Sequence, residues 1–260
     1  MATEGWTGWD EYARFYDWEN ARTMGRKDVR FWQDFARRRH GEGGPVLELG
    51  CGTGRVLIPV ARTGVQVVGV DRSEPMLAYA RERARRLPRA KRPEMVRADI
   101  RQLPFPDRLF SAVMAPYGIL QSLTRERDLA AMLAESARVL KRGGSLGIDL
   151  VPDLPAWDEY RNRTSLRGKL GRSGGRVTLV ESVRQDRRRR LTIFDQEYLE
   201  TEGGRIRRHR FSLTFRTLPL PEVAARVEKA GFRVTAVLGD YRGRAWDLRA
   251  DVWLLLAARR

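Results

Sequence analysis

The chain is poor in the residues that build covalent cross-links and metal sites. Its 260 residues include a single cysteine, Cys51, and two histidines, His40 and His209. One cysteine cannot form a disulfide within the chain, and too few cysteines and histidines remain for a cysteine-rich metal site. We therefore expect no bound metal, and we interpret Cys51 as a small packed residue instead of a nucleophile.

Long hydrophobic runs are also missing. No apolar stretch approaches the roughly 18 residues that a membrane span needs, and no signal-peptide pattern precedes the first motif. We expect a cytoplasmic protein without a membrane partner. A hydrophobic content of 42% over 260 residues suffices for one sizeable core, so we predict a single domain.

Lysine is scarce although the protein is strongly basic. Only five of the 50 basic residues are lysines, and the formal net charge is +17. Such a charge suggests nucleic acid as a partner. The arginines, however, are spread over the whole chain, and runs such as Arg187–Arg190 and Arg205–Arg210 are typical of solvated hairpins. Nucleic acid therefore stays open as the less favoured partner.

A short glycine-rich stretch organises the rest of the chain. Pro45–Leu49 reads as a buried strand, and it is followed by Gly50, Gly52 and Gly54 and then by an apolar helical pattern. Glycines allow a tight turn and a close approach to a ligand, and N–H groups at a helix start attract anions. The dinucleotide fingerprint fails, because its last glycine is replaced by Arg55.

An acid follows the second apolar run, Val65–Val70. Asp71 lies about 20 residues after the first glycine, where a carboxylate can accept hydrogen bonds from two ribose hydroxyls. With Asp71, the stretch Val46–Gly54 resembles the first two motifs of class I S-adenosylmethionine-dependent methyltransferases. The segments ending at Asp99 and at Gly144 resemble further motifs of that family.

The resemblance implies S-adenosylmethionine as cofactor and assigns residues to it. It implies that Asp71 holds the ribose, that Arg72 and Met76 flank the adenine, and that Asp99 accepts from its amino group while Ile100 packs on the ring. The residues that it places at the cofactor are Tyr12, Glu48, Gly50, Cys51, Gly52, Gly54, Asp71, Arg72, Met76, Asp99, Ile100 and Ala115.

The tip of the fourth expected strand, Ala115-Pro116-Tyr117, bears on the acceptor. It lacks the Asn or Asp followed by two prolines and an aromatic residue that marks methyltransferases of nucleic-acid bases, and it has no Pro-Cys pair. We therefore favour a small-molecule acceptor. Neither histidine lies near the expected methyl position, which favours an amine or an acidic hydroxyl. Tyr16 and Tyr117 are candidates for positioning the acceptor, with core packing as the equal alternative.

We predict an α/β fold, a doubly wound, seven-stranded Rossmann-like methyltransferase sheet. Residues 1–44 would form a helical lid, 45–150 the cofactor-binding half, 151–218 an antiparallel β insert, and 219–260 the last helix and strands. The insert should cover the cleft or pair two subunits as a homodimer, because its alternating pattern requires one buried face. The remaining alternatives are an RNA or DNA methyltransferase and a non-catalytic cofactor-binding module.

Overall fold

A seven-stranded mixed sheet forms the body of the protein. The computed structural model describes residues 8–23, 25–151, 158–171, 175–247, 249–250 and 252–260. The strand order is β10-β11-β5-β4-β1-β2-β3. Strand β11 runs in the direction opposite to that of the other six strands. Its strands are β1 (Val46–Leu49), β2 (Val67–Asp71), β3 (Glu94–Arg97), β4 (Phe110–Ala115), β5 (Leu140–Leu150), β10 (Phe232–Leu238) and β11 (Trp253–Arg259). The doubly wound seven-stranded sheet is confirmed.

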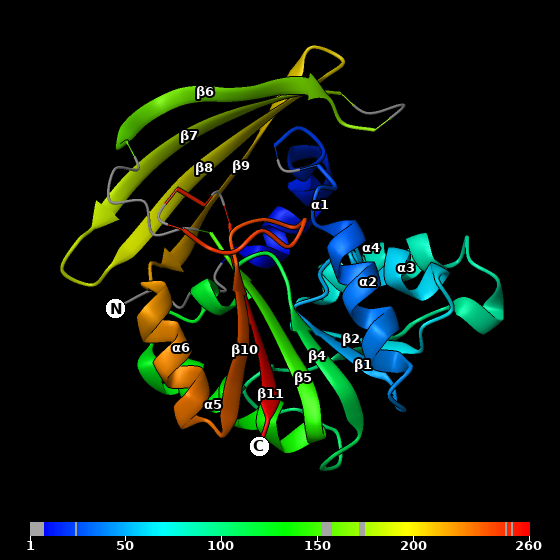
Figure 1. Cartoon of the computed structure of the whole chain (residues 1–260). Helices are drawn as coiled ribbons and strands as arrows, with labels where there is room; N and C mark the ends of the chain where they lie inside the picture. The colour runs from blue at the N-terminus through cyan, green and yellow to red at the C-terminus, as the bar shows by residue number, and fades with distance from the viewer. Residues whose placement is uncertain (1–7, 24, 152–157, 172–174, 248, 251) are drawn as a thin grey trace.

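Helices cover both faces of this sheet (Figure 1). They are α2 (Val29–His40), α3 (Leu57–Arg62), α4 (Glu74–Ala84), α5 (Glu126–Val139) and α6 (Leu220–Lys229). A further helix, α1 (Trp9–Asn20), lies apart from the sheet, and 3-10 turns occur at Arg89–Lys91 and Ile119–Ser122. Pro75 in the first turn of α4 and the Ser73 hydroxyl, which accepts from the Met76 N–H, fix the start of that helix.

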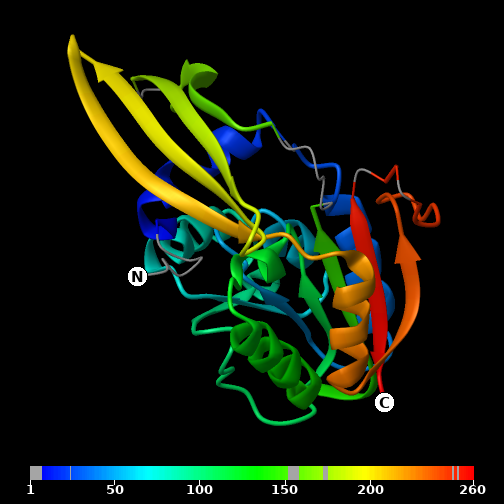
Figure 2. The same cartoon turned by 90° about the vertical axis from the view of Figure 1, so that its left-hand side faces the viewer.

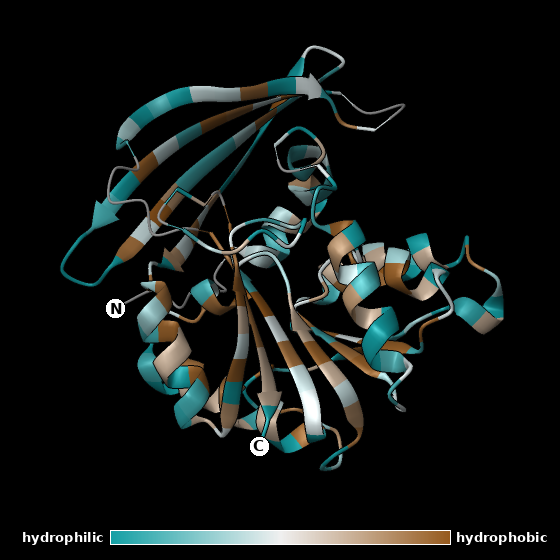
Figure 3. Cartoon of the chain, viewed as in Figure 1, coloured by the Kyte–Doolittle hydropathy of each residue, from teal (hydrophilic) through white to brown (hydrophobic). Residues whose placement is uncertain are grey.

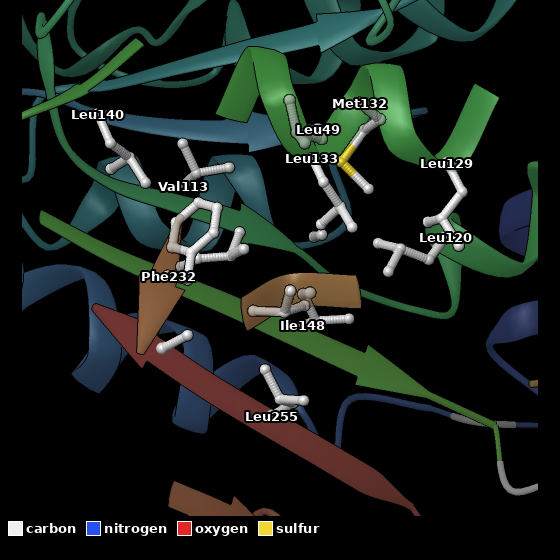
Figure 4. Close-up of a cluster of buried hydrophobic side chains, with 14 of the residues drawn as sticks. Leu49, Val113, Leu120, Leu129, Met132, Leu133, Leu140, Ile148, Phe232 and Leu255 are labelled. Atoms are coloured by element: carbon white, nitrogen blue, oxygen red, sulfur yellow. The ribbon is translucent and has the colours of Figure 1, made fainter. Parts of the chain in front are cut away.

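Each strand contributes side chains to two cores, because successive residues point to opposite faces. Leu47 and Val113 belong to the core under α5 and α6, whereas Val46 and Ala112 belong to the core under α2 and α3. Figure 4 shows the first of these cores, with Val113 and Ile148 from the sheet and Met132 from α5. In Figure 3 the central strands are mostly brown or white, and teal is common on the helices and the insert.

The predicted insert is a separate four-stranded antiparallel sheet. It contains β6 (Tyr160–Lys169), β7 (Arg176–Asp186), β8 (Leu191–Glu202) and β9 (Arg205–Arg216), in that order. It extends away from the body, with α1 between the two (Figure 2). A third core joins residues of α1, such as Phe15, to insert residues such as Tyr198. The apolar face of the insert is thus buried within the chain.

Two elements differ from the sequence-based prediction. Strand β6 was not expected, because its residues are mostly exposed and lack the alternating apolar pattern; it is an edge strand held by β7 alone. Strand β5 starts at Leu140, directly after α5, and includes Lys141–Gly144; the cations and glycines of that segment predict a turn, with the strand starting at Ser145. The pairing with β4 is irregular there, and Gly143 has a φ of 74°.

The two helices of the first 44 residues have different places. α2 packs against α3 and strands β1 and β4 of the central sheet, whereas α1 contacts α4 and the insert strand β9. Only α1 therefore stands where the expected lid would stand. None of the helices in the described part of the chain is long and apolar enough to cross a membrane.

Candidate functional site

A cavity of about 400 Å³ opens at the carboxyl ends of β1, β2 and β4. Most of the predicted cofactor residues line it, together with both candidate tyrosines. They are Tyr16, Glu48, Gly50, Cys51, Gly52, Asp71, Arg72, Met76, Asp99, Ile100 and Tyr117. Parallel strands that end at one edge of a sheet bring these segments together, which explains why residues far apart in sequence share one site.

Three predicted residues lie outside the lining. Tyr12 is buried between α1 and the insert, where its hydroxyl donates to Glu19 (2.9 Å). Ala115 is fully buried at the end of β4. Gly54 packs against α3 and α4, and a Cβ there would lie 2.8 Å from Ile58. These residues shape the walls of the cavity without facing it.

The glycine loop serves the cavity differently from our expectation. Gly50 and Gly52 have φ values of 63° and 52°, a left-handed conformation that favours glycine. The N–H of Gly52 donates to Asp71 (2.8 Å), and that of Cys51 donates to Val70 (3.0 Å). The following helix α3 starts only at Leu57 and has six residues. The Gly52 N–H of the loop thus holds the acid Asp71, and the expected anion site at a helix start stays a prediction.

The carboxylate of Asp71 is fixed by backbone groups. Its Oδ2 accepts from Gly52 and its Oδ1 accepts from the N–H of Ser73, both at 2.8 Å. Burial raises the pKa of Asp71, and these hydrogen bonds oppose the rise. A carboxylate has about four lone-pair sites, so two remain for hydroxyl groups of a ligand.

Glu48 presents an unsatisfied acceptor to the same cavity. It is 2% exposed, burial raises its pKa well above the usual range, and its Oε2 is buried without a hydrogen-bond partner in the described residues. Leaving a buried carboxylate oxygen unpaired is costly. A donor or cation from a ligand would remove that cost.

Asp99 forms the third acidic position. Arg101 donates to both of its oxygens (2.9 and 2.7 Å) and also to Asp128 (2.9 Å). The hydrogen bonds from Arg101 lower the pKa of Asp99, so that the carboxylate stays charged. Ile100 lies beside it in the lining.

Sequence reasoning missed the role of Arg55, the residue that breaks the dinucleotide fingerprint. Its guanidinium lies in the cavity wall, donates to both oxygens of the buried Asp28 (2.7 Å each), and stands 5.0 Å over the ring of Tyr117. The Tyr117 ring in turn meets that of Tyr16 edge-on at 6.4 Å. The signal was an arginine inside an otherwise apolar helical pattern.

α1 and the insert close the cavity from above. Trp9 and Tyr16 of α1 and Phe215 of β9 line it, and the Trp9 ring contacts those of Tyr16 (6.5 Å) and Phe215 (6.2 Å). Burial raises the pKa of Tyr16 to about 12 and that of Tyr117 still further. Both phenols are therefore protonated at neutral pH.

A Rossmann-like sheet with three acids at the ends of neighbouring strands defines a nucleotide-type binding protein of the α/β class. Comparison with known proteins gives the family. A methyltransferase domain matches residues 46–144. The chain is 30% identical over 218 residues to the cypemycin N-terminal methyltransferase of a Streptomyces species, and the aligned residues cover 84% of each chain. The protein therefore belongs to the S-adenosylmethionine-dependent methyltransferases.

Two further comparisons agree with this assignment. The ubiquinone/menaquinone biosynthesis C-methyltransferase of Geobacter sulfurreducens is 41% identical over 109 residues, which span 41% of each chain. The structure of CalS10, an amino pentose methyltransferase of Micromonospora echinaspora with bound S-adenosylmethionine, has a TM-score of 0.68 at 23% identity and covers 95% of this chain and 96% of that one. The predicted fold and the predicted cofactor are confirmed.

The residues present fit S-adenosylmethionine. Besides its carboxylate, the cofactor carries an ammonium, a sulfonium, ribose hydroxyls and an adenine amino group, which are cations or donors. The cavity offers acceptors to them, namely the unpaired oxygen of Glu48 and the carboxylates of Asp71 and Asp99. Which cofactor group each acid contacts stays a prediction from the sequence.

Proposed function

We propose that the protein transfers the methyl group of S-adenosylmethionine to an amine of a small molecule, with an acidic hydroxyl as the second choice of acceptor. The cypemycin enzyme is named for the methylation of an N-terminus, and its similarity extends over most of both chains. The quinone enzyme is named for C-methylation, and its similarity covers less than half of each chain. The longer match favours nitrogen.

The enclosure of the cavity beside Tyr117 carries this proposal. Aromatic side chains from three segments, among them Trp9, Tyr117 and Phe215, line the cavity beside the tip of β4, where we expect the reacting methyl. Such a site suits a compact acceptor, whereas a base within a polynucleotide would need an open groove.

Methyl transfer depends mainly on how the protein positions the two reactants. When bound, S-adenosylmethionine would supply a methyl carbon activated by its sulfonium. A nitrogen lone pair would form the C–N bond, the electron pair of the C–S bond would stay on sulfur, and the methylated nitrogen would release its proton to water. The protein must hold the acceptor roughly 3 Å from the carbon and keep water away. Tyr16 and Tyr117 stay protonated, so their hydroxyls orient the acceptor instead of removing its proton. The Arg55 guanidinium fixes the Tyr117 ring.

Label transfer from methyl-labelled S-adenosylmethionine tests the proposal. The protein is offered a panel of small primary and secondary amines, a matched panel of phenols, and total RNA, and mass spectrometry locates the label. We expect N-methylated products and an equal amount of S-adenosylhomocysteine. Tyr16→Phe should lower the rate on amines at least about tenfold, while Tyr79→Phe, at an exposed position outside the cavity, should leave it unchanged. Label in RNA alone would contradict the proposal.

A further inference from the structure

A second, larger cavity adjoins the cofactor cavity. It measures about 1210 Å³ and lies between α2, the end of β5 and the segment that joins β10 to β11. In Figure 1 that segment, in orange and red, arches over the upper end of β5. Tyr117 and Gly118 line both cavities. The two spaces therefore meet at the tip of β4, beside the expected methyl position.

Cations surround this second cavity. Five basic residues line it, all of them exposed: Lys27, Arg30, Arg38, Arg242 and Arg244. Within the part of the chain that the structure describes, none of these five side chains has a hydrogen bond or an ion pair. In the buried arginine Arg55, by contrast, both terminal nitrogens donate to Asp28.

The acids of the cavity already have partners. Asp34 pairs with Arg37 (2.5 Å). Asp240 accepts from the backbone N–H groups of Arg242 and Arg244, at 2.8 and 3.0 Å.

Asp149, the third acid of the cavity, accepts from the Gly118 N–H and the Tyr241 hydroxyl, at 2.9 Å each. The acids thus have internal partners, whereas the cations around the rim have none. An anion would complete this arrangement.

We propose that the second cavity holds an anionic group of the methyl acceptor, a phosphate or a carboxylate, while the reacting nitrogen reaches the cofactor cavity past Tyr117. This inference rests on the proposed function. Arginine side chains bind both anions with paired, charge-assisted hydrogen bonds. The amino end of α2, which lies next to Lys27 and Arg30, adds the positive end of a 12-residue helix. Phe31 and Leu238 supply an apolar wall for the rest of the acceptor.

Calorimetry with sodium pyrophosphate and with sodium succinate tests the inference on the full chain. We expect the intact protein to bind at least one of these probes, and the probe that binds identifies the anion as a phosphate or a carboxylate. The double variant Arg30→Gln/Arg242→Gln should weaken that binding at least about tenfold, because the loss of one charge-assisted hydrogen bond raises the dissociation constant about tenfold. Both side chains are exposed, so the variant should fold normally.

A matched variant separates a local site from general charge. Arg188→Gln/Arg207→Gln removes the same two charges from exposed positions in the insert and should change the affinity less than twofold. S-adenosylhomocysteine should bind all three proteins equally and leave pyrophosphate or succinate affinity unchanged. Equal weakening in both variants, competition with S-adenosylhomocysteine, or the absence of binding by both probes would overturn the inference. None of these outcomes would affect the transfer of label to amines.

A structured RNA supplies the remaining arm of the test. We expect no tight complex with the intact protein at 150 mM salt. An RNA that bound at that salt and lost its affinity only in Arg30→Gln/Arg242→Gln would assign the rim to nucleic acid and contradict the proposal.

Discussion

Three carboxylates at neighbouring strand ends differ in how the chain holds them. The Oε2 of Glu48 has no partner among the described residues, Asp71 is held by two backbone N–H groups, and Asp99 is held by the guanidinium of Arg101. The differences suit different ligand groups: a cation at Glu48, hydroxyls at Asp71, and a neutral amino group at the charged Asp99.

The first prediction concerns Asp71. Asp71→Ala should weaken the binding of S-adenosylhomocysteine at least tenfold, because the loss of hydrogen bonds in a buried site costs about 1 to 3 kcal/mol. Calorimetry on the folded variant measures the change. Glu82→Ala, at an exposed position on α4 outside the cavity, is the control and should bind like the intact protein. Unchanged affinity in a folded Asp71→Ala protein would remove the ribose role.

The second prediction concerns Asp149 at the end of β5. Burial raises its pKa from 3.8 to about 6. A carboxyl whose folded-state pKa is raised adds stability below its unfolded pKa and loses that contribution as the pH rises through the folded value. The free energy of unfolding of the intact protein, measured against that of Asp149→Asn, should therefore fall by about 2.4 kcal/mol between pH 4 and pH 7.

Urea unfolding of both proteins at several pH values measures this difference. Asparagine keeps the shape of the side chain and does not titrate, so the other groups cancel in the comparison. A difference that stays constant over that range would show that Asp149 has an ordinary pKa.

At the scale of single residues, the sequence could predict those candidate site residues that lie within a recognisable local pattern. Glu48, Asp71 and Asp99 each lie in or just after a recognisable strand, so their neighbours identify them. The Arg55–Asp28 pair could not be predicted, because 27 residues separate its members and no spacing rule relates them. The Tyr12 hydroxyl bonds to Glu19 within α1, and Glu19 also accepts from Tyr198 of the insert, a contact that depends on how α1 packs on the insert.

At the scale of elements, α1 joins the insert to the body of the protein. Phe15 is fully buried and stacks on Tyr198 of β8, with ring centroids 4.1 Å apart. Tyr16, the next residue, faces the cofactor cavity. One helix therefore buries the apolar face of the insert and supplies a wall of the site.

The third prediction is that Phe15→Ala destabilises the protein by about 3 to 5 kcal/mol, because it leaves a cavity between α1 and the insert. It should also weaken S-adenosylhomocysteine binding, since α1 would no longer be held over the site. Urea unfolding and calorimetry measure the two effects. Phe15→Leu, which fills much of the space, should lose less of both. A stable Phe15→Ala protein would mean that α1 does not depend on this contact.

Element prediction succeeded where the pattern was strong and failed at the edge of the insert. Strands β7, β8 and β9 alternate apolar and polar residues, whereas β6 carries mostly exposed side chains. An edge strand needs only one paired side and little apolar surface, so its sequence gives no period to detect. A homodimer through the insert stays a prediction, and α1 already covers the inner face that motivated it.

At the scale of the whole molecule, the excess of arginine has more than one use. Some arginines are structural, such as Arg55 with Asp28 and Arg101 with Asp99. Others, such as Arg205 and Arg207, are exposed and unpaired within the described residues. Their neighbour Arg208 pairs with Glu197. The net charge of +17 does not indicate how the arginines divide between these uses, because pairing depends on tertiary contacts.

The last prediction uses this charge to separate a small-molecule enzyme from a nucleic-acid enzyme. A track that neutralised six to ten phosphates would make affinity for RNA fall by about 10³ to 10⁵ between 50 and 200 mM salt, from a tight value at low salt. We expect weak binding without sequence preference throughout, because the aromatic wall of the cofactor cavity is enclosed by α1 and β9. Ala115-Pro116-Tyr117 also offers no side-chain acceptor for a base amino group. Filter binding of a structured RNA across that salt range provides the measurement. A tight complex at 150 mM salt that also takes up the methyl label would replace the small-molecule acceptor with RNA, and it would leave the fold and the cofactor unchanged.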